Sequence, residues 1–133
     1  MPAVANINVM GLILAVVVSM IIGGVWYSVF AEKWARAAGF KKGQKMSSAP
    51  SAYAMQAVYS LVMAYVLAHF VAYANASTLT AGMQTGFWIW LGFVATTTAG
   101  MTLWENKSWE LWLINNGNYL LTLMVMGAIL AVY

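Results

Sequence analysis

The chain has 133 residues, of which 63% are hydrophobic and only 7% are charged, whereas soluble domains carry about 25% charged residues. This composition excludes a water-soluble domain, because too few polar side chains are present to cover its surface. The net charge is +3, and cysteine is absent, which excludes disulfides, thiolate metal sites and cysteine nucleophiles. With one histidine and no aspartate, we expect no metal site and no cofactor.

Four apolar runs are long enough to cross a bilayer, which takes about 20 residues. They cover residues 9–30, 51–73, 81–103 and 109–133. Glu110, in the first turn of the last run, is the only Asp, Glu, Lys or Arg residue in them. The connectors between them are too short to fold alone. The sequence therefore predicts an all-α polytopic membrane protein, with a single transmembrane domain over residues 1–133 folded as an antiparallel four-helix bundle.

The basic residues predict the orientation of the bundle. Five of the six lie in the first connector, and the sixth lies in the third connector, on the same side of the membrane: Lys33, Arg36, Lys41, Lys42, Lys45 and Lys107. Connectors rich in lysine and arginine stay in the cytoplasm. The tail over residues 1–8 has no charged side chain and can cross easily, so we expect both termini outside the cytoplasm.

Small residues recur every four positions on the first two spans, a pattern that allows helices to pack closely in lipid. The stripe on the first span consists of Gly11, Ala15, Ser19 and Gly23, and the stripe on the second consists of Ser60, Ala64, Ala68 and Ala72. The third span offers Gly82 and Gly86, and the fourth offers Gly127. These stripes predict packing faces, and they leave open whether the faces meet within one chain or between chains.

Aromatic residues gather where the first span leaves the membrane on the cytoplasmic side. Trp26, Tyr27, Phe30 and Trp34 lie there, with Trp104, Trp109 and Trp112 near the same level. An interfacial belt is the favoured interpretation, because amphipathic rings prefer the headgroup zone. The alternative is an aromatic mouth that binds a lipid or an apolar solute, formed by Trp26, Tyr27, Trp34 and Trp109.

A run of carboxamides, Asn115-Asn116-Gly117-Asn118, begins about 9 Å into the last span at 1.5 Å per residue. One interpretation is interhelical hydrogen bonding to the threonine run that begins at Thr96, or to Gln56 on the second span. The alternative is a polar pathway for a solute, because polar residues inside a membrane often mark such paths. His69, near the outer end of the second span, is interpreted as a structural residue rather than a proton relay.

Two segments of the chain resemble a known family. They are Gly24-Val25-Trp26-Tyr27-Ser28-Val29-Phe30 followed by Trp34, and Leu113-Ile114-Asn115-Asn116-Gly117 continuing to Met126-Gly127-Ala128-Ile129-Leu130. Both resemble the family catalogued as domain of unknown function 1761. The resemblance covers essentially the whole chain and implies a small bacterial four-helix protein, hence one of the plasma (inner) membrane. It implies no particular activity.

The remaining functional classes follow from which residues are present. We expect that the protein is not an enzyme, because no general base lies beside a nucleophile. We also expect no nucleic-acid partner, because the basic residues are accounted for by the orientation of the chain in the membrane. Two hypotheses remain for a protein in contact with membrane lipid. The first is a packing or accessory module that self-associates or docks on a larger membrane complex. The second is an uncoupled channel or carrier for a small neutral or lipid-like solute.

Overall fold

The structure is a computed structural model that describes residues 6–41 and 49–133. Within them it contains α1 (Val9–Val29), α2 (Ala31–Ala37), α3 (Pro50–Tyr73), α4 (Leu79–Ile89), the π-helical segment η1 (Trp90–Ala95), α5 (Thr96–Trp104) and α6 (Trp109–Val132). Because α4, η1 and α5 are continuous, they form one span. Four helices are thus long and apolar enough to cross a membrane, and the predicted all-α polytopic architecture is confirmed.

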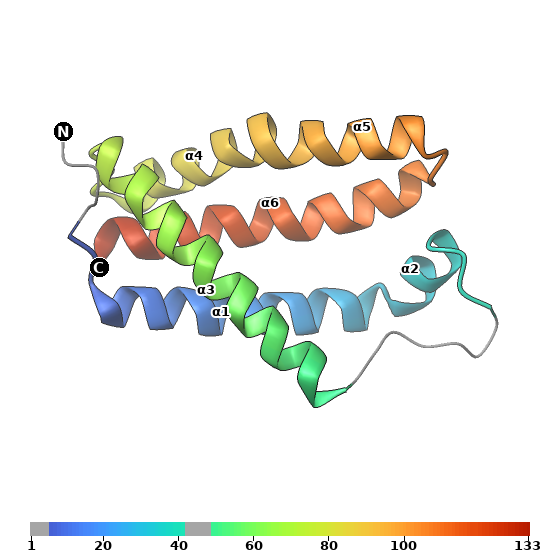
Figure 1. The fold of residues 1–133 in the computed structure, drawn as a ribbon. Helices are drawn as coiled ribbons and strands as arrows, with labels where there is room; N and C mark the ends of the chain where they lie inside the picture. The colour runs from blue at the N-terminus through green and yellow to red at the C-terminus, as the bar shows by residue number, and fades with distance from the viewer. Residues whose placement is uncertain (1–5, 42–48) are drawn as a thin grey trace.

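Successive spans run in opposite directions along the molecule, as Figure 1 shows. The start of α1 and the end of α6 lie at one end of the molecule, here called the terminal end. Helix α2 and the turn between α5 and α6 lie at the other end, here called the connector end. Lys42, Lys45 and residues 1–5, on which the predicted orientation also rests, lie outside the described residues.

Side-chain and backbone signals at the helix ends explain where the spans begin and stop. The side chain of Asn8 accepts hydrogen bonds from two amides of α1, Thr78 caps α4, and Ser108 caps α6, so each satisfies amides that a helix start leaves without partners. In the two short turns Asn75 and Asn106 adopt positive φ angles of 54° and 53°. Asparagine tolerates this left-handed conformation better than most residues, which allows the chain to reverse direction there.

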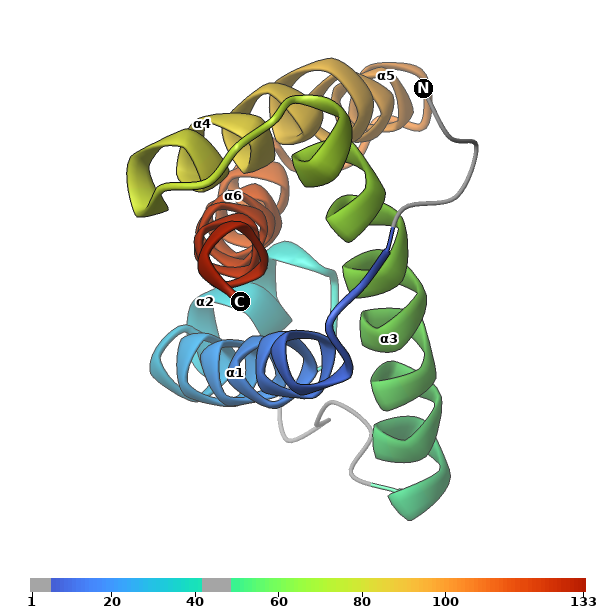
Figure 2. The same cartoon turned by 90° about the vertical axis from the view of Figure 1, so that its left-hand side faces the viewer.

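Helix α6 lies at the centre of the bundle. It packs against α4, α1 and α3, and Figure 2 shows these three helices on different sides of it. The closest approach is between α4 and α6, where Gly82 and Gly86 of α4 are buried. The absence of a Cβ at Gly82 and Gly127 brings the two backbones into contact, as small residues allow in membrane helices.

Helix α3 crosses the other helices obliquely, and only its second half enters the bundle (Figures 1 and 2). The residues of α3 that are buried all lie in this half: Ser60, Ala64, Leu67, Ala68 and Val71. Over residues 50–59 every residue except Ala57 is exposed. The core formed by Ala15, Ala64, Leu67, Val71, Leu123 and Met126 therefore lies toward the terminal end.

The small-residue stripes face the inside of the chain over most of their length. Gly11, Ala15 and Ser19 are buried on α1, and Ser60, Ala64 and Ala68 are buried on α3, with Ala15 and Ala64 in one core cluster and Gly11 against Tyr133. Beyond these residues the stripes leave the packed interface, because a Cβ added at Gly23 would meet nothing within 4 Å and Ala72 is exposed. The first three residues of each stripe are thus buried within one chain, and the last is not.

Candidate functional site

The carboxamide run of α6 is the main polar feature of the described interior, and each of its residues meets a different neighbour. Asn115 faces the end of α1 and the short helix α2. Its Oδ1 accepts a hydrogen bond of 2.7 Å from the Tyr27 hydroxyl and one of 3.1 Å from the Trp34 indole Nε1. These two donors come from positions more than 80 residues away in the sequence. Asn115 therefore ties the first span and α2 to the last span.

Asn116 faces the opposite way, toward the third span, and is 2% exposed. Its Oδ1 accepts a hydrogen bond of 3.1 Å from the Trp90 indole. Its Nδ2 donates to the Thr98 hydroxyl at 3.0 Å and to the carbonyl oxygen of Trp112 at 3.1 Å. The Trp112 indole also donates to the Thr98 hydroxyl, at 3.1 Å. Both ends of the Asn116 amide thus have partners.

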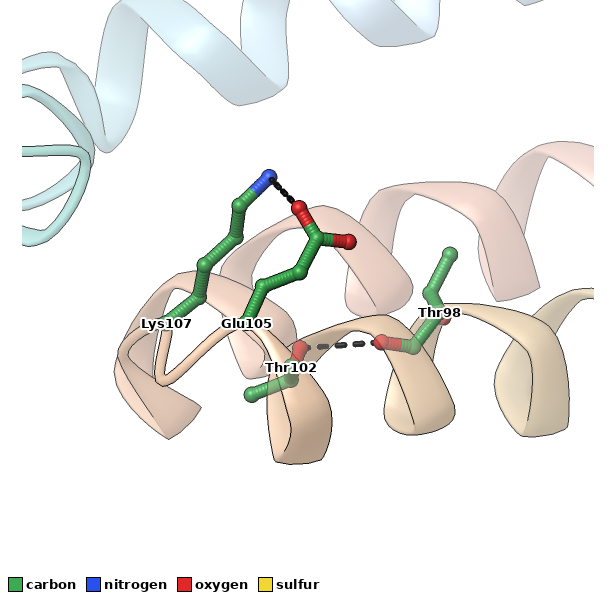
Figure 3. Close-up of polar contacts among 4 residues, drawn as sticks. All are labelled: Thr98, Thr102, Glu105 and Lys107. Carbon is green, nitrogen blue, oxygen red and sulfur yellow. Dashed lines mark hydrogen bonds and ion pairs between the residues drawn. The ribbon is translucent and has the colours of Figure 1, made fainter.

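Thr98 and Thr102 lie one turn apart on α5, close to the turn that leads into α6 (Figure 3). The Thr102 hydroxyl donates to the Thr98 carbonyl oxygen at 2.9 Å. The Thr98 hydroxyl itself donates to the Val94 carbonyl oxygen at 2.7 Å, so it serves the α6 residues Trp112 and Asn116 as an acceptor. The same view shows Lys107 paired with Glu105 at 3.5 Å, with both side chains about half exposed. This ion pair belongs to the surface of the turn, and surface pairs contribute little to stability.

Gly117 provides the space for Trp26. A Cβ at position 117 would lie 2.6 Å from Cζ2 of the Trp26 ring, which is far inside van der Waals contact. The Trp26 Nε1 donates to the Ile114 carbonyl oxygen at 2.9 Å. The Trp26 indole therefore packs closely enough against α6 for its N–H to bond the α6 backbone. This close packing requires glycine at position 117.

Asn118 completes the run and is 8% exposed. Its Oδ1 accepts a hydrogen bond of 3.5 Å from Thr122, one turn further along α6. Asn118 and Tyr119 also interact with the Tyr27 hydroxyl. Tyr27 thus contacts Asn115 and Asn118, the two carboxamides that helical spacing places nearest to the same side.

The π-helical segment η1 determines which residues of the third span face Asn116. In a continuous α-helix, Thr98 would be turned about 80° away from Trp90, because each residue advances by about 100°. A π turn absorbs one extra residue, which reduces the difference to about 20°. Trp90 and Thr98 consequently both reach Asn116. No local feature of the sequence indicated this segment.

Several residues singled out from the sequence lie elsewhere. Thr96 is exposed, and its hydroxyl bonds the Gly92 carbonyl oxygen of its own helix. Gln56 bonds Ser60, also within one helix, at 3.5 Å. His69 contacts the Tyr65 carbonyl oxygen at 2.8 Å, and its ring contacts Tyr65 and Tyr73. None of the three contacts the carboxamide run through a hydrogen bond in the described structure.

The aromatic residues of the candidate mouth divide into two groups. Trp26, Tyr27 and Trp34 converge on α6 through their polar atoms. Trp109 remains 50% exposed and contacts Trp112 edge to face at 6.0 Å. Sequence reasoning did not assign partners to Trp90 and Trp112 or a role to Gly117. A tryptophan inside a span, at the same depth as a carboxamide on a neighbouring or the same span, is the signal that could have predicted that Trp90 and Trp112 take part in hydrogen bonding.

The chemistry available to this cluster is hydrogen bonding between helices. Among the described residues, no buried side-chain nitrogen or oxygen lacks a hydrogen-bond partner. No group of three His, Cys, Asp or Glu side chains within them could hold a metal ion. The donors are indoles and hydroxyls, and the acceptors are carboxamides and backbone carbonyls. A buried network with every member paired rigidifies the contact between helices.

Comparison with known proteins adds a family and nothing more specific. No curated protein and no solved structure matches the chain significantly. A family model matches residues 10–131, a range that contains every member of the carboxamide cluster and all four spans except the first residue of the first and the last residue of the fourth. With a match over nearly its whole length, this chain belongs to the family described as protein of unknown function DUF1761.

Proposed function

We propose that the protein is a non-catalytic module of the bacterial plasma membrane that self-associates through the connector-end half of α3. The single observation that carries this proposal is the exposure of that half-helix. Over residues 50–59 the helix has left the bundle, and every residue except Ala57 is exposed, Met55 by 47% and Tyr59 by 58%. From Ser60 onward the same helix carries five buried residues. The connector-end part of this span is therefore largely uncovered by the described chain.

The exposed half continues the packing face of the buried half. Ser60, Ala64 and Ala68 lie on the face that packs inside the bundle. One and two turns before Ser60 the same face carries Gln56 and Ala52, both exposed. A small residue and a carboxamide are the groups that join helices in lipid, through close approach and hydrogen bonding. This face is suited to another helix more than to acyl chains.

A second copy of the chain is the partner that we propose. The basic side chains Lys33, Arg36 and Lys107 lie at the connector end, so by the distribution of positive charge this end is cytoplasmic and both termini are outside. All copies then share one orientation. A two-fold axis along the membrane normal would bring α3 of one copy against α3 of the other, which gives a closed dimer. The packing stripes on α1 and α6 take no part, because they are used within the chain.

The alternative, an uncoupled channel or carrier that uses the carboxamide run, has less support. A pathway needs polar groups that can exchange partners with a solute. Asn115 and Asn116 instead bond tyrosine, tryptophan and threonine side chains of neighbouring helices. Solute flux through reconstituted vesicles would favour the alternative if replacement of Asn115 and Asn118 by leucine abolished it.

The non-catalytic assignment rests on where the ionisable side chains lie. Glu32, Glu105 and Glu110 are exposed at the connector end, and His69 lies in the other half of the bundle, toward the end of α3. General acid–base catalysis needs such groups within hydrogen-bond reach of one another or of a common substrate. In the described structure His69 lies apart from the three glutamates.

The absence of cysteine makes disulfide cross-linking a direct test. Single cysteines are introduced at each position from 51 to 56, and the full chain is reconstituted in lipid vesicles and oxidised. We expect a dimer that forms most readily at positions three or four residues apart, because one face of α3 meets its copy. The matched control is Val25→Cys on α1, because the Val25 side chain is 60% exposed. Val25 lies four residues from the end of α1, just as Ala54 lies four residues from the start of α3.

Native size in mild detergent completes the test. A dimer that is dispersed by Ala52→Trp supports self-association, provided that the helix content is unchanged. A monomer in both vesicles and detergent, or cross-linking no greater than that of Val25→Cys, would refute it. A mixed adduct with another protein in native membranes, in the absence of any dimer, would replace self-association by docking on a larger complex.

A further inference from the structure

A groove of about 510 Å³ lies between the end of α3 and the beginning of α4, at the terminal end. It is open at the side, and it arises because α3 and α4 diverge from the turn that joins them (Figure 2). Its α4 wall is one helical face, formed by Ala81, Gln84, Thr85, Trp88 and Ile89. Phe70 and Tyr73 of α3 form the opposite wall. This groove shares no residue with the carboxamide cluster or with the exposed half of α3.

Gln84 is the unusual residue in this groove. Its side chain is exposed and has no hydrogen bond to any described residue. The other polar side chain of the α4 wall, Thr85, donates to the Ala81 carbonyl oxygen at 2.9 Å and is satisfied locally. A carboxamide without a partner is costly in an apolar medium. Gln84 therefore needs a hydrogen-bond acceptor that no described residue supplies.

The depth of Gln84 indicates which acceptor is available. The third span has 26 residues, a length of about 39 Å, against about 30 Å for the hydrocarbon core. If the span is centred, Gln84 lies about 3 Å below the upper limit of the core, and Trp88 lies about 6 Å deeper. The ester carbonyls of a glycerolipid lie at that limit, and its acyl chains lie below it.

The walls of the groove favour an acyl chain over a helix. Helix backbones approach most closely in lipid at glycines, and the two glycines of α4, Gly82 and Gly86, face α6 rather than the groove. The groove side carries Trp88, which is 65% exposed, and is faced by Phe70, which is 43% exposed. These bulky rings leave a channel between them that a flexible hydrocarbon chain can follow.

We infer that this groove binds one diacylglycerolipid from the outer leaflet, with the Gln84 amide donating a hydrogen bond to an ester carbonyl and an acyl chain lying between Trp88 and Phe70. The carboxamide supplies a donor, which an ester carbonyl accepts and an ether oxygen accepts only weakly. The groove therefore distinguishes ester-linked from ether-linked lipids. This inference does not depend on self-association.

The test uses two phosphatidylcholines with equal chain lengths, one a diester and the other a diether. The full-length protein in mild detergent is exposed to an equal mixture, and native mass spectrometry measures which lipid remains bound as a single adduct. We expect the diester to be preferred about fivefold, the effect of one hydrogen bond. Gln84→Leu should abolish the preference while helix content and native size stay unchanged.

Thr97→Val is the control, because it removes a polar group from an exposed position of the same span whose side chain bonds its own helix. We expect this variant to keep the diester preference. Equal binding of the two lipids by the unchanged protein would overturn the inference. A diester preference that persists in Gln84→Leu would also overturn it. A change in the native size of Gln84→Leu without a change in its lipid binding would overturn it as well, because it would show a second copy of the chain in the groove.

Discussion

Replacement of Gly82 by alanine tests the closest contact in the bundle. A Cβ at position 82 would collide with the Gly127 carbonyl oxygen and would lie 2.7 Å from both the Gly127 carbonyl carbon and the Ala131 Cβ. Backbone atoms cannot rotate away, so α4 and α6 must separate. Overpacking of this kind costs about 1–3 kcal/mol, and the higher helix propensity of alanine offsets up to about 1 kcal/mol. We expect a net loss of about 1–2 kcal/mol in the free energy of unfolding.

Titration of the purified protein from mild detergent into dodecyl sulfate, followed by circular dichroism, measures this loss. The matched control is Gly23→Ala, where an added Cβ meets nothing within 4 Å and only the propensity gain applies. A Cβ at Gly127 would collide with the Gly82 carbonyl oxygen. The double variant Gly82→Ala with Gly127→Ala should therefore cost less than the sum of the single changes, because the helices have already moved apart. Equal stability of Gly82→Ala and Gly23→Ala would show that α4 and α6 do not meet as described.

Three further predictions concern the hydrogen bonds of α6. Asn116→Leu removes the acceptor of the Trp90 indole and one donor to the Thr98 hydroxyl, and we expect it to lower the free energy of unfolding by about 1–3 kcal/mol, measured in the same titration. Tyr27→Phe and Asn115→Leu, alone and combined, form a double-mutant cycle whose coupling should be about 0.6 kcal/mol, the average for such bonds in membranes; zero coupling would contradict the 2.7 Å bond. Ser108→Ala removes the acceptor for the amides of Glu110 and Leu111 and should cost about 1 kcal/mol, whereas Ser77→Ala, in an exposed turn, should cost nothing measurable.

The spans could be predicted from sequence because the bilayer imposes a simple requirement. Backbone groups in lipid must bond within their own helix, so a run of apolar residues of sufficient length reveals each span. The predicted starts and ends fall within two residues of the helix ends observed from Val9 to Val132. The oblique course of α3 could not be predicted in this way, because it depends on how Ser60, Ala64 and Ala68 fit against α1 and on nothing local to residues 50–59.

The partners of the carboxamides were harder to predict, because they depend on rotation about helix axes. If the third span were a regular α-helix, Thr97 rather than Thr98 would share a face with Trp90, since seven residues complete almost two turns. The π-helical segment from Trp90 to Ala95 changes that relation. A sequence shows the threonine run but not which of its members faces inward, and Thr96, the member named first, is exposed.

The tryptophans show how one residue type has two different roles in this chain. Trp104 and Trp109 remain 82% and 50% exposed, as an interfacial belt requires. Trp26, Trp34 and Trp90 instead donate their indole N–H groups to atoms of α6. Counting aromatic residues near the ends of spans cannot separate these roles, because the same side chain suits the headgroup zone and a buried acceptor.

The two segments that carry the family resemblance form a single structural unit. Trp26, Tyr27 and Trp34 come from the first segment, and Ile114 and Asn115, whose oxygens they bond, come from the second. Because these polar atoms are used between helices, the family motif accounts for how α1 and α6 are held together rather than for what the protein binds. The surfaces for which we propose a partner, the exposed half of α3 and the groove beside Gln84, lie outside the motif. Substitutions there should leave the stability of the bundle unchanged, whereas substitutions within the motif should lower it.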